Sequence, residues 1–465
     1  MCERLLFLTG KLAEKNLHRV LESMQPTTFE PVVHQLGINV AGLMTTDMIR
    51  RRLDMPDGID RVIVPGRCRG DLGTLSLHYD IPVERGPEEL KDLPQYFGYG
   101  EKPPDLSRYD IKIFAEIVDA PDLDIDTILQ RAQVYRGWGA DIIDIGCLPN
   151  TPFPHLTETI QALHGEGFLV SVDSVDSEEL LTGGKAGADY LLSLRGNTLW
   201  IADEVAAIPV IIPSQPGDLN SLLQAMDILD KKGLHYLADP VLDPMLFGFT
   251  ESLFRYRELH EQRPDAEILM GIGNVTELTD ADTNGINALL IGIAKELGIT
   301  HILTTQVSPH ARRAVSEIDI ARRTMFLACE QNSLPRDFDD RLLCMHERRP
   351  FPYSKAEIQE TATAVRDPSY RVQISEDGIH VYNRDGLHTG TDPFALFQKL
   401  ELGDDTGHAF YMGTELARAQ IAWQLGKRYV QDQELNWGCA MDKKQDDLTR
   451  TSEPDSTHGK TGTGS

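Results

Sequence analysis

Several features that mark particular protein classes are missing from this 465-residue chain. None of its six cysteines forms a C-x-x-C pair, which argues against a zinc ribbon, an iron–sulfur cluster or a disulfide scaffold. No apolar run is long enough to span a membrane, and the start, MCERLLFLTG, lacks the small-residue cleavage site of a signal peptide. We therefore expect a protein of the reducing cytoplasm with no membrane partner.

Basic residues are also scarce. The chain has 45 Lys and Arg against 72 Asp and Glu, which gives a formal charge of −27. Binding to nucleic acid requires a basic face, so this balance disfavours a nucleic-acid partner. Hydrophobic content of 41% and charged content of 25% are typical of a soluble globular protein, and the length predicts two to four domains.

Residues 1–108 predict a small α/β, Rossmann-like domain. Apolar runs at 5–10, 29–37 and 61–66 alternate with helical stretches at 11–23 and 39–53, which indicates parallel βαβ units. The P-loop spacing is absent after the first run. Arg67 and Arg69, in the loop PGRCRGD, are candidates for binding an anion, although a solvated turn explains them equally well.

A longer strand–helix series follows Pro103–Pro104 and predicts a (β/α)8 TIM barrel over residues 109–345. The expected strands are 113–119, 141–146, 169–173, 190–194, 209–213, 236–239, 267–271 and 301–305. A doubly wound open sheet is the rival fold. It usually carries a Gly-rich phosphate turn after its first strand, and VDAPDLD at that place is not one.

The pattern changes after residue 345. YRVQISEDGIHVYNRDG predicts two strands joined at Asp377–Gly378, and residues 413–429 predict an amphipathic helix. Together these indicate a small C-terminal α+β domain over residues 346–438. Residues 439–465 have almost no large apolar side chains, so we expect a disordered tail.

Three strand ends of the predicted barrel carry acids, namely Asp144, Asp173 and Asp239. The C-terminal ends of barrel strands form one mouth, so these carboxylates should converge there. A converging set of acids suits a ligand with adjacent N–H donors, such as the 2-amino-4-oxo-pyrimidine edge of a pterin. It could also hold a divalent cation through oxygen ligands, although we assign no metal site.

The segments VSVDS, LADPVLDP and GIGNVTELTDADTNGINALLIGIAKELGI resemble, in this order, the pterin-binding barrel family. That family contains dihydropteroate synthase and the methyltetrahydrofolate methyltransferases that serve corrinoid proteins. The resemblance covers about residues 110–330 and implies a reduced pterin, of folate or tetrahydromethanopterin type, as substrate or ligand. The whole chain resembles dihydropteroate synthase-like proteins of organisms that use tetrahydromethanopterin, in which such a barrel lies between an N-terminal α/β domain and a small C-terminal domain.

The resemblance also implies roles for individual residues. Asp173 and Asp239 would bind the pterin edge, Asp144 would line the site, and Asn274 would lie near the reactive N5 and act in catalysis. At the fourth strand the methyltransferases have a ligand-binding Asn, for which this chain offers Ser193 or Asn197. Plainer interpretations remain: Asp144 as a hydrogen-bond anchor, Asp239 as a helix cap, and Asn274 as a turn residue.

The chain departs from dihydropteroate synthase where that enzyme carries basic residues after its seventh and eighth strands. His310 and Arg312, with Arg313 beside them, lie near the second position as candidates for binding an anion. Three hypotheses therefore stay open: a dihydropteroate synthase-like transferase, a methyl-tetrahydropterin:corrinoid methyltransferase with a corrinoid protein partner, and a non-catalytic pterin-binding assembly protein. The oligomeric state is open too, with a dimer as one option.

Overall fold

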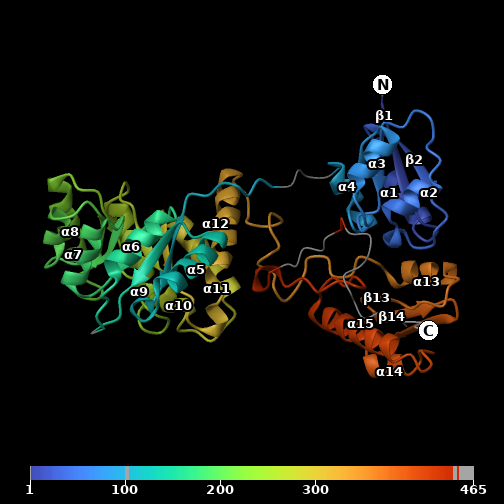
Figure 1. The fold of residues 1–465 in the computed structure, drawn as a ribbon. Helices are drawn as coiled ribbons and strands as arrows, with labels where there is room; N and C mark the ends of the chain where they lie inside the picture. The colour runs from blue at the N-terminus through green and yellow to red at the C-terminus, as the bar shows by residue number, and fades with distance from the viewer. Residues whose placement is uncertain (1, 100–103, 150, 443–447, 450–465) are drawn as a thin grey trace, which may run out of the picture. The chain divides into compact units, whose positions relative to one another are not determined.

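A computed structural model describes residues 2–99, 104–149, 151–442 and 448–449 of this chain. The chain divides into two compact units (Figure 1). Unit 1 comprises residues 1–103, 345–436 and 442–465, and unit 2 comprises residues 104–344 and 437–441. The N-terminal and C-terminal parts, which read as separate domains in the sequence, thus belong to one unit. Most of the expected tail 439–465 lies outside the described residues.

Unit 2 is built on an eight-stranded sheet in which every neighbouring pair is parallel, and each of the eight expected strands is present. Hydrogen-bonded neighbours follow the order β10-β9-β8-β7-β6-β5-β12-β11, and a bridge between Ala238 and Ile268 joins the two ends. The sheet is therefore nearly closed as a (β/α)8 barrel rather than an open doubly wound sheet. Its strands are β5 Lys112–Ile117, β6 Ile142–Gly146, β7 Leu169–Asp173, β8 Tyr190–Leu194, β9 Ile208–Ile211, β10 Leu237–Ala238, β11 Leu269–Gly271 and β12 His301–Thr304.

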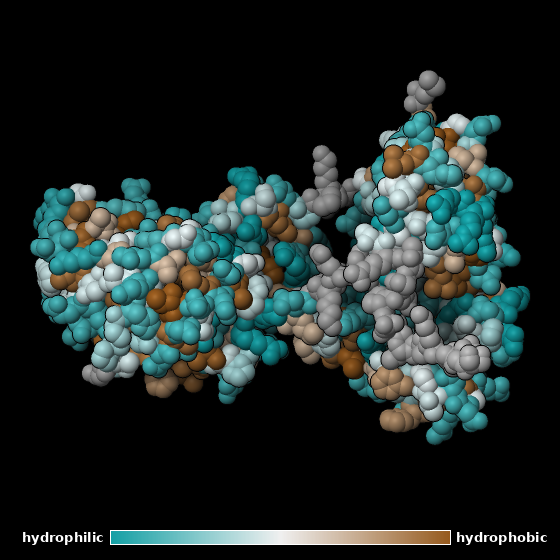
Figure 2. All heavy atoms as spheres, in the orientation of Figure 1, coloured by the Kyte–Doolittle hydropathy of each residue, from teal (hydrophilic) through white to brown (hydrophobic). Residues whose placement is uncertain are grey.

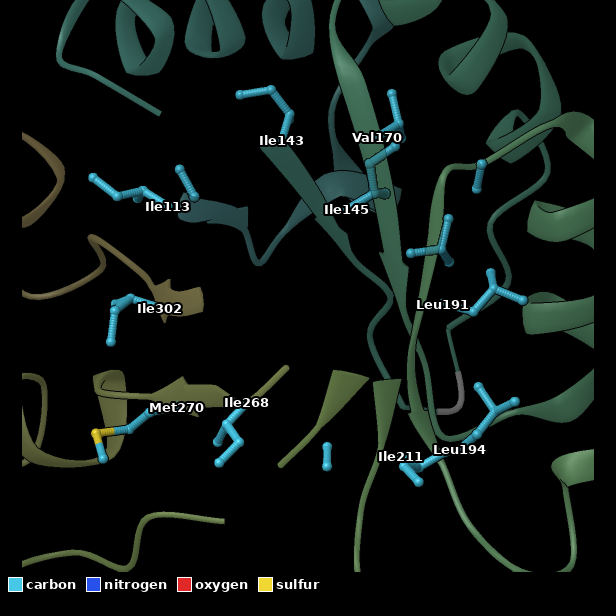
Figure 3. Close-up of a cluster of buried hydrophobic side chains, with 14 of the residues drawn as sticks. Ile113, Ile143, Ile145, Val170, Leu191, Leu194, Ile211, Ile268, Met270 and Ile302 are labelled. Atoms are coloured by element: carbon cyan, nitrogen blue, oxygen red, sulfur yellow. The ribbon is translucent and has the colours of Figure 1, made fainter. Parts of the chain in front are cut away.

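Helices alternate with these strands and cover the outside of the barrel. Every second strand residue points outward into one large apolar core, which Figure 3 shows for side chains such as Ile113, Ile145, Val170 and Ile302. Parallel strands buried on both faces are continuous apolar runs, which is why their positions could be predicted. The helices are α5 Ile125–Gly137, α6 Leu156–Gly165, α7 Ser177–Ala186, α8 Leu219–Lys232, α9 Phe249–Gln262, α10 Gly273–Thr276, α11 Thr283–Glu296 and α12 Ala314–Glu330.

The alternate strand residues point into the barrel. A separate buried cluster fills its interior with Phe114, Ile142, Tyr190, Leu192, Val210, Leu237 and Leu269. Because side chains alternate along a strand, residues two or four positions further along face the same interior. The interior is thus apolar toward the N-terminal ends of the strands and becomes acidic toward their C-terminal ends.

The N-terminal part of unit 1 is a four-stranded parallel sheet with strand order β2-β1-β3-β4. Two apolar clusters pack on its opposite faces, as in a doubly wound α/β domain. The short strand β4 was not expected from the sequence. The elements are β1 Glu3–Thr9, α1 Glu14–Ser23, β2 Phe29–Gln35, α2 Thr46–Arg52, β3 Arg61–Val64, α3 Leu72–Tyr79, β4 Val83–Arg85 and α4 Leu93–Tyr96.

The C-terminal part of unit 1 is a three-stranded antiparallel sheet with order β13-β14-β15. The predicted hairpin is present between β13 and β14, but the sheet has a third strand, β15, that the sequence analysis did not anticipate. The long helix begins and ends earlier than the expected 413–429. The elements are α13 Lys355–Ala364, β13 Arg371–Ser375, β14 Gly378–Asn383, β15 Gly386–Gly390, α14 Pro393–Phe397 and α15 Thr406–Leu425.

The two parts of unit 1 are joined by direct contacts. Leu12 packs against the apolar cluster of Ile358 and Tyr382, and the Tyr353 hydroxyl donates to Glu89 at 2.7 Å. In each unit, hydrophilic side chains cover much of the visible face (Figure 2). None of the described helices is long and apolar enough to cross a membrane.

Candidate functional site at the barrel mouth

Three acids from adjacent barrel strands meet at the C-terminal end of the interior. Glu116 on β5 pairs in register with Asp144 on β6, and Gly146 at the end of β6 pairs with Asp173 on β7. All three acids share the inward alternation of Phe114 and Ile142. One carboxylate oxygen from each lies within 4.8 Å of the other two. The barrel therefore holds a compact cluster, called here the acid triad, of Glu116, Asp144 and Asp173.

The acid triad has few partners of its own. Asp144 is fully buried; one oxygen accepts from the Ser171 hydroxyl at 2.5 Å, whereas Oδ2 has no hydrogen-bond partner in the described part of the chain. Asp173 accepts from the Ser193 hydroxyl at 3.4 Å. A charged oxygen in such a place is costly, which agrees with the raised pKa of Asp144.

Gly146 makes room for the cluster. A Cβ atom at this position would lie 2.7 Å from Oε1 of Glu116 and 2.9 Å from the Cα atom of Val118. Any larger residue would therefore displace Glu116 from the mouth or push the strands apart. The glycine thus belongs to the site as well as to the strand.

Burial and mutual repulsion raise the pKa values of these acids, so they stay protonated at higher pH than ordinary carboxyl groups. Burial raises the pKa of Glu116 to about 8, and the negative charges of Asp173 and Glu277 act in the same direction. The pKa of Asp144 is raised well above its ordinary value, first by burial and then by Asp173 and Glu116. Burial also raises the pKa of Asp173. At neutral pH the acid triad therefore shares at least one proton, as close carboxylates do.

Asp239, directly after β10, completes the acidic lining. Its Oδ1 accepts from the buried Tyr256 hydroxyl at 2.6 Å and from the backbone N–H of Val241 at 2.7 Å. Burial raises the pKa of Asp239 to about 6, although these two hydrogen bonds and the charge of Arg255 hold it down, and Asp173 is close enough to push it up. Arg255 is itself engaged by Asp243 at 2.6 Å and by the Val241 carbonyl.

The chemistry open to this arrangement is that of oxygen acceptors in a sheltered site. Ionised Asp173 and Asp239 can accept adjacent N–H donors from a flat heterocycle, and charge-assisted pairs of this kind are strong. Protonated Glu116 can in turn donate to a ligand oxygen or nitrogen. The acid triad could also hold a divalent cation through three carboxylate oxygens once its protons are lost.

The other predicted site residues are distributed more widely. Asn274, on α10, is exposed, and its Nδ2 donates to the Leu242 carbonyl at 2.7 Å. Asn197 and Arg312 are exposed, while Nε2 of His310 lies 3.0 Å from the Thr276 carbonyl. The structure therefore brings Asp144, Asp173 and Ser193 together. Arg67 and Arg69 belong to unit 1, where Nη1 of Arg67 donates to the Gln431 carbonyl at 3.3 Å.

Three side chains of the candidate site were not predicted from the sequence: Glu116, Ser171 and Tyr256. A signal existed for Glu116, because a lone acid at an inward position of an otherwise apolar buried strand is unusual. Ser171 shares that inward alternation with Asp173. Tyr256 lies on α9, remote in sequence from Asp239, and only the packing of that helix shows its role.

A model described as a family of unknown function, DUF6513, matches residues 3–88. A curated relative, the uncharacterized protein MJ0107 of Methanocaldococcus jannaschii, is 27% identical, and the match covers 93% of this chain and 99% of the relative.

Solved structures of dihydropteroate synthases match about half of the chain. The Vibrio fischeri enzyme is 18% identical with a TM-score of 0.39, covering 49% of this chain and 95% of that one. The Anaplasma phagocytophilum enzyme with bound 6-hydroxymethylpterin-monophosphate is 17% identical with a TM-score of 0.37, covering 47% and 99%. The barrel assignment itself follows from the strand order and closure described above.

Proposed function

We propose that the barrel mouth binds the 2-amino-4-oxo-pyrimidine edge of a reduced pterin, and that the chain is a dihydropteroate synthase-like protein of folate or tetrahydromethanopterin biosynthesis or one-carbon metabolism. The observation that carries this proposal is the pair Asp173 and Asp239. Both follow the inward alternation of their strands, both lie at the same mouth, and they are close enough for the charge of one to raise the pKa of the other. The order of the VSVDS and LADP segments supports the same ligand.

Asp239 is fixed before a ligand arrives. Tyr256 and the Val241 N–H both donate to its Oδ1, which leaves Oδ2 for the ligand. A ring N–H and a neighbouring amino group present two parallel donors, and a preorganised carboxylate meets them at little cost in conformational entropy. Neutral Glu116 can donate to a ring acceptor instead of repelling it.

The reaction proposed for this site is group transfer to or from the bound pterin. Arg255, beside Asp239, is already paired with Asp243, and the basic residues that dihydropteroate synthase carries after its seventh and eighth strands are not matched in this sequence, so less positive charge is placed to stabilise a departing diphosphate. We therefore expect slow dihydropteroate synthesis.

Methyl transfer to a corrinoid is the second candidate. Asn274 Nδ2 donates to the Leu242 carbonyl, which orients the amide. Its Oδ1 can then accept a hydrogen bond from N5 when that nitrogen is protonated.

Calorimetry with 6-hydroxymethyl-7,8-dihydropterin tests the binding proposal. Asp239→Asn should weaken affinity by roughly 1.5–3 kcal/mol, the worth of a hydrogen bond to a charged group, while the fold is retained. Asp265→Asn is the matched control, because it removes the same charge from an exposed loop of the barrel and should leave affinity unchanged. Equal affinity in Asp239→Asn and wild type would remove Asp239 from the site, and absence of binding by the wild type would remove the pterin from the proposal.

Turnover then separates the reactions. Diphosphate release is measured with 4-aminobenzoate and the pterin diphosphate, and demethylation of an N5-methyl pterin is measured with cob(I)alamin. In the active assay, Asn274→Ala should lower turnover by roughly 10–1000-fold if the amide acts at N5. Rapid diphosphate release would contradict our assignment of the mouth as poor in positive charge. Binding without turnover in either assay would favour a non-catalytic pterin-binding protein.

A further inference from the structure

A cavity in unit 1 is formed by residues that precede and follow the barrel in the sequence, and it has no part in the proposed pterin chemistry. It has a volume of about 410 Å³, which falls within the usual range for small-molecule sites. Residues of both parts of unit 1 line it. The N-terminal sheet supplies one wall through Thr9, Pro65 and Pro87, and the C-terminal part supplies the other through Tyr353 and Tyr382, among others.

The position of this cavity in the N-terminal sheet is informative. Thr9 ends β1, Pro65 follows β3, and Pro87 lies just beyond β4, so the cavity lies at the carboxyl ends of parallel strands. The strand order is β2-β1-β3-β4, so the chain moves outward from β1 to β2 and then crosses to the opposite side of β1 to form β3. The cavity is therefore at the topological switch point, where open α/β sheets bind their ligands.

The lining consists mainly of apolar side chains and includes one arginine, Arg67, without a carboxylate partner among the described residues. Apolar and aromatic side chains predominate, including Leu12, Val40, Ile358 and Tyr382. Arg67, from the loop after β3, donates only to the Gln431 carbonyl in the described part of the chain and has no carboxylate partner there. At the start of α1, the backbone N–H groups of Lys15 and Asn16 find no acceptor among the described residues, and Asn16 also lines the cavity.

Each acidic residue that lines the cavity has a hydrogen-bonding neighbour; the partner is a cation for Glu357 and a neutral donor for the other three, which keep their charge. Their partners are Gln433 for Glu88, Tyr353 for Glu89, Lys91 for Glu357 and Tyr411 for Asp432. The second lining arginine, Arg371, is paired with Asp367 at 2.8 Å. Of the two lining arginines, Arg67 is therefore the one without a carboxylate partner among the described residues, and its guanidinium can pair with an anionic group on a ligand.

We propose that unit 1 binds a small organic anion in this cavity, with a flat apolar ring body between the two parts of the unit and a carboxylate or phosphate group at Arg67. This site lies in unit 1 and is built from other residues than the barrel mouth, which belongs to unit 2. A ligand held by both parts would also stabilise their association, because it contacts residues from each.

The test uses two fluorescent probes on the full chain. 1-Anilinonaphthalene-8-sulfonate carries an anionic group on a flat apolar body, and N-phenyl-1-naphthylamine is the same body without the sulfonate. The wild type should bind the sulfonate probe more tightly. Arg67→Gln should weaken the sulfonate probe by about 10- to 100-fold, the effect of losing a charged hydrogen bond, and leave the neutral probe unchanged.

Two further variants locate the site. Leu12→Trp fills the cavity from a partly buried position and should abolish binding of both probes. Arg51→Gln removes an exposed arginine of the same unit and should change neither. The proposal is overturned if wild type binds neither probe, if Leu12→Trp leaves the sulfonate probe in place, or if Arg67→Gln affects both probes equally. Far-UV circular dichroism of each variant confirms that the fold is intact.

Discussion

The two ends of the barrel differ in whether their buried charged groups have partners of opposite charge. At the end where the strands begin, Arg322 is 1% exposed and its guanidinium is surrounded by acceptors: Asp141, Asp319 and the carbonyls of Ile111 and Gly139. At the end where the strands finish, the acid triad has no basic partner within ion-pair distance in the described part of the chain, and Oδ2 of Asp144 has no donor.

This difference separates stability from function. A buried charge with every hydrogen bond satisfied is part of the folded framework, and its removal leaves other groups unpaired. A cluster of like charges with raised pKa values stores unfavourable energy that a ligand can relieve. Such clusters are therefore expected where a protein binds or reacts, and residues like Arg322 are expected where it is held together.

The largest effect on stability should come from removing Arg322, the paired charge at the end where the strands begin. Arg322→Met would remove the cationic partner of Asp141 and the donor to two backbone carbonyls, so we expect a loss of roughly 3–5 kcal/mol in the free energy of unfolding. Urea denaturation followed by circular dichroism measures it. Arg257→Met, at an exposed arginine paired within α9, should change stability by less than about 0.5 kcal/mol. Similar values for the two variants would remove the contrast between buried and exposed pairs.

Removing one charge from the acid triad should instead increase the free energy of unfolding. The folded pKa of Glu116, about 8, exceeds its ordinary value of 4.5, so the native state holds the proton more tightly. The stability from this group is full below pH 4.5 and is lost as pH rises toward 8. Glu116→Gln stays neutral and should be more stable than wild type by roughly 1–3 kcal/mol above pH 8.

Unfolding at a series of pH values measures this gain. The difference between Glu116→Gln and wild type should vanish near pH 4 and grow through the window from 4.5 to 8. Glu204→Gln, at an exposed glutamate of the same unit, should show no such growth. A pH-independent difference for Glu116→Gln would mean that packing, and not charge, sets the behaviour of the acid triad.

A smaller effect should appear in the pH dependence of pterin affinity. The pterin edge donates hydrogen bonds, so it prefers ionised Asp239, whose pKa is about 6. Affinity should fall as pH drops below about 6, by up to about tenfold per pH unit, and Asp239→Asn should show a flatter profile. Calorimetry between pH 5 and 7.5 is sufficient. Tighter binding at the acidic end would show that the protonated form holds the ligand.

The smallest effect on affinity is expected at Asn274. It is exposed at the mouth, and its amide is occupied by Leu242, so it does not belong to the acid triad. Asn274→Ala should change dihydropterin affinity by less than about 0.5 kcal/mol. A loss as large as that of Asp239→Asn would place Asn274 among the groups that hold the ring, and the boundary of the site would move accordingly.

Most of the barrel fold could be predicted from local sequence patterns. All eight strands could be placed because each is a short apolar run buried on both faces, and their spacing left room for one helix each. Asp173 and Asp239 could be placed at strand ends for the same reason. The elements that were missed have weak local signals: β4 has three residues, and β15, with the sequence GLHTG, contains one large apolar side chain.

What the sequence by itself determined is therefore the order of strands and helices, the acids at the strand ends and the acidic charge of the chain. Tertiary structure alone decided that Glu116 joins Asp144 and Asp173, because closure of the sheet brings neighbouring strands into register. It also decided that Tyr256 fixes Asp239, and that parts of the chain separated by more than 240 residues enclose one cavity in unit 1. Those contacts depend on chain segments distant in sequence, and a local pattern carries no information about which distant segment will pack beside it.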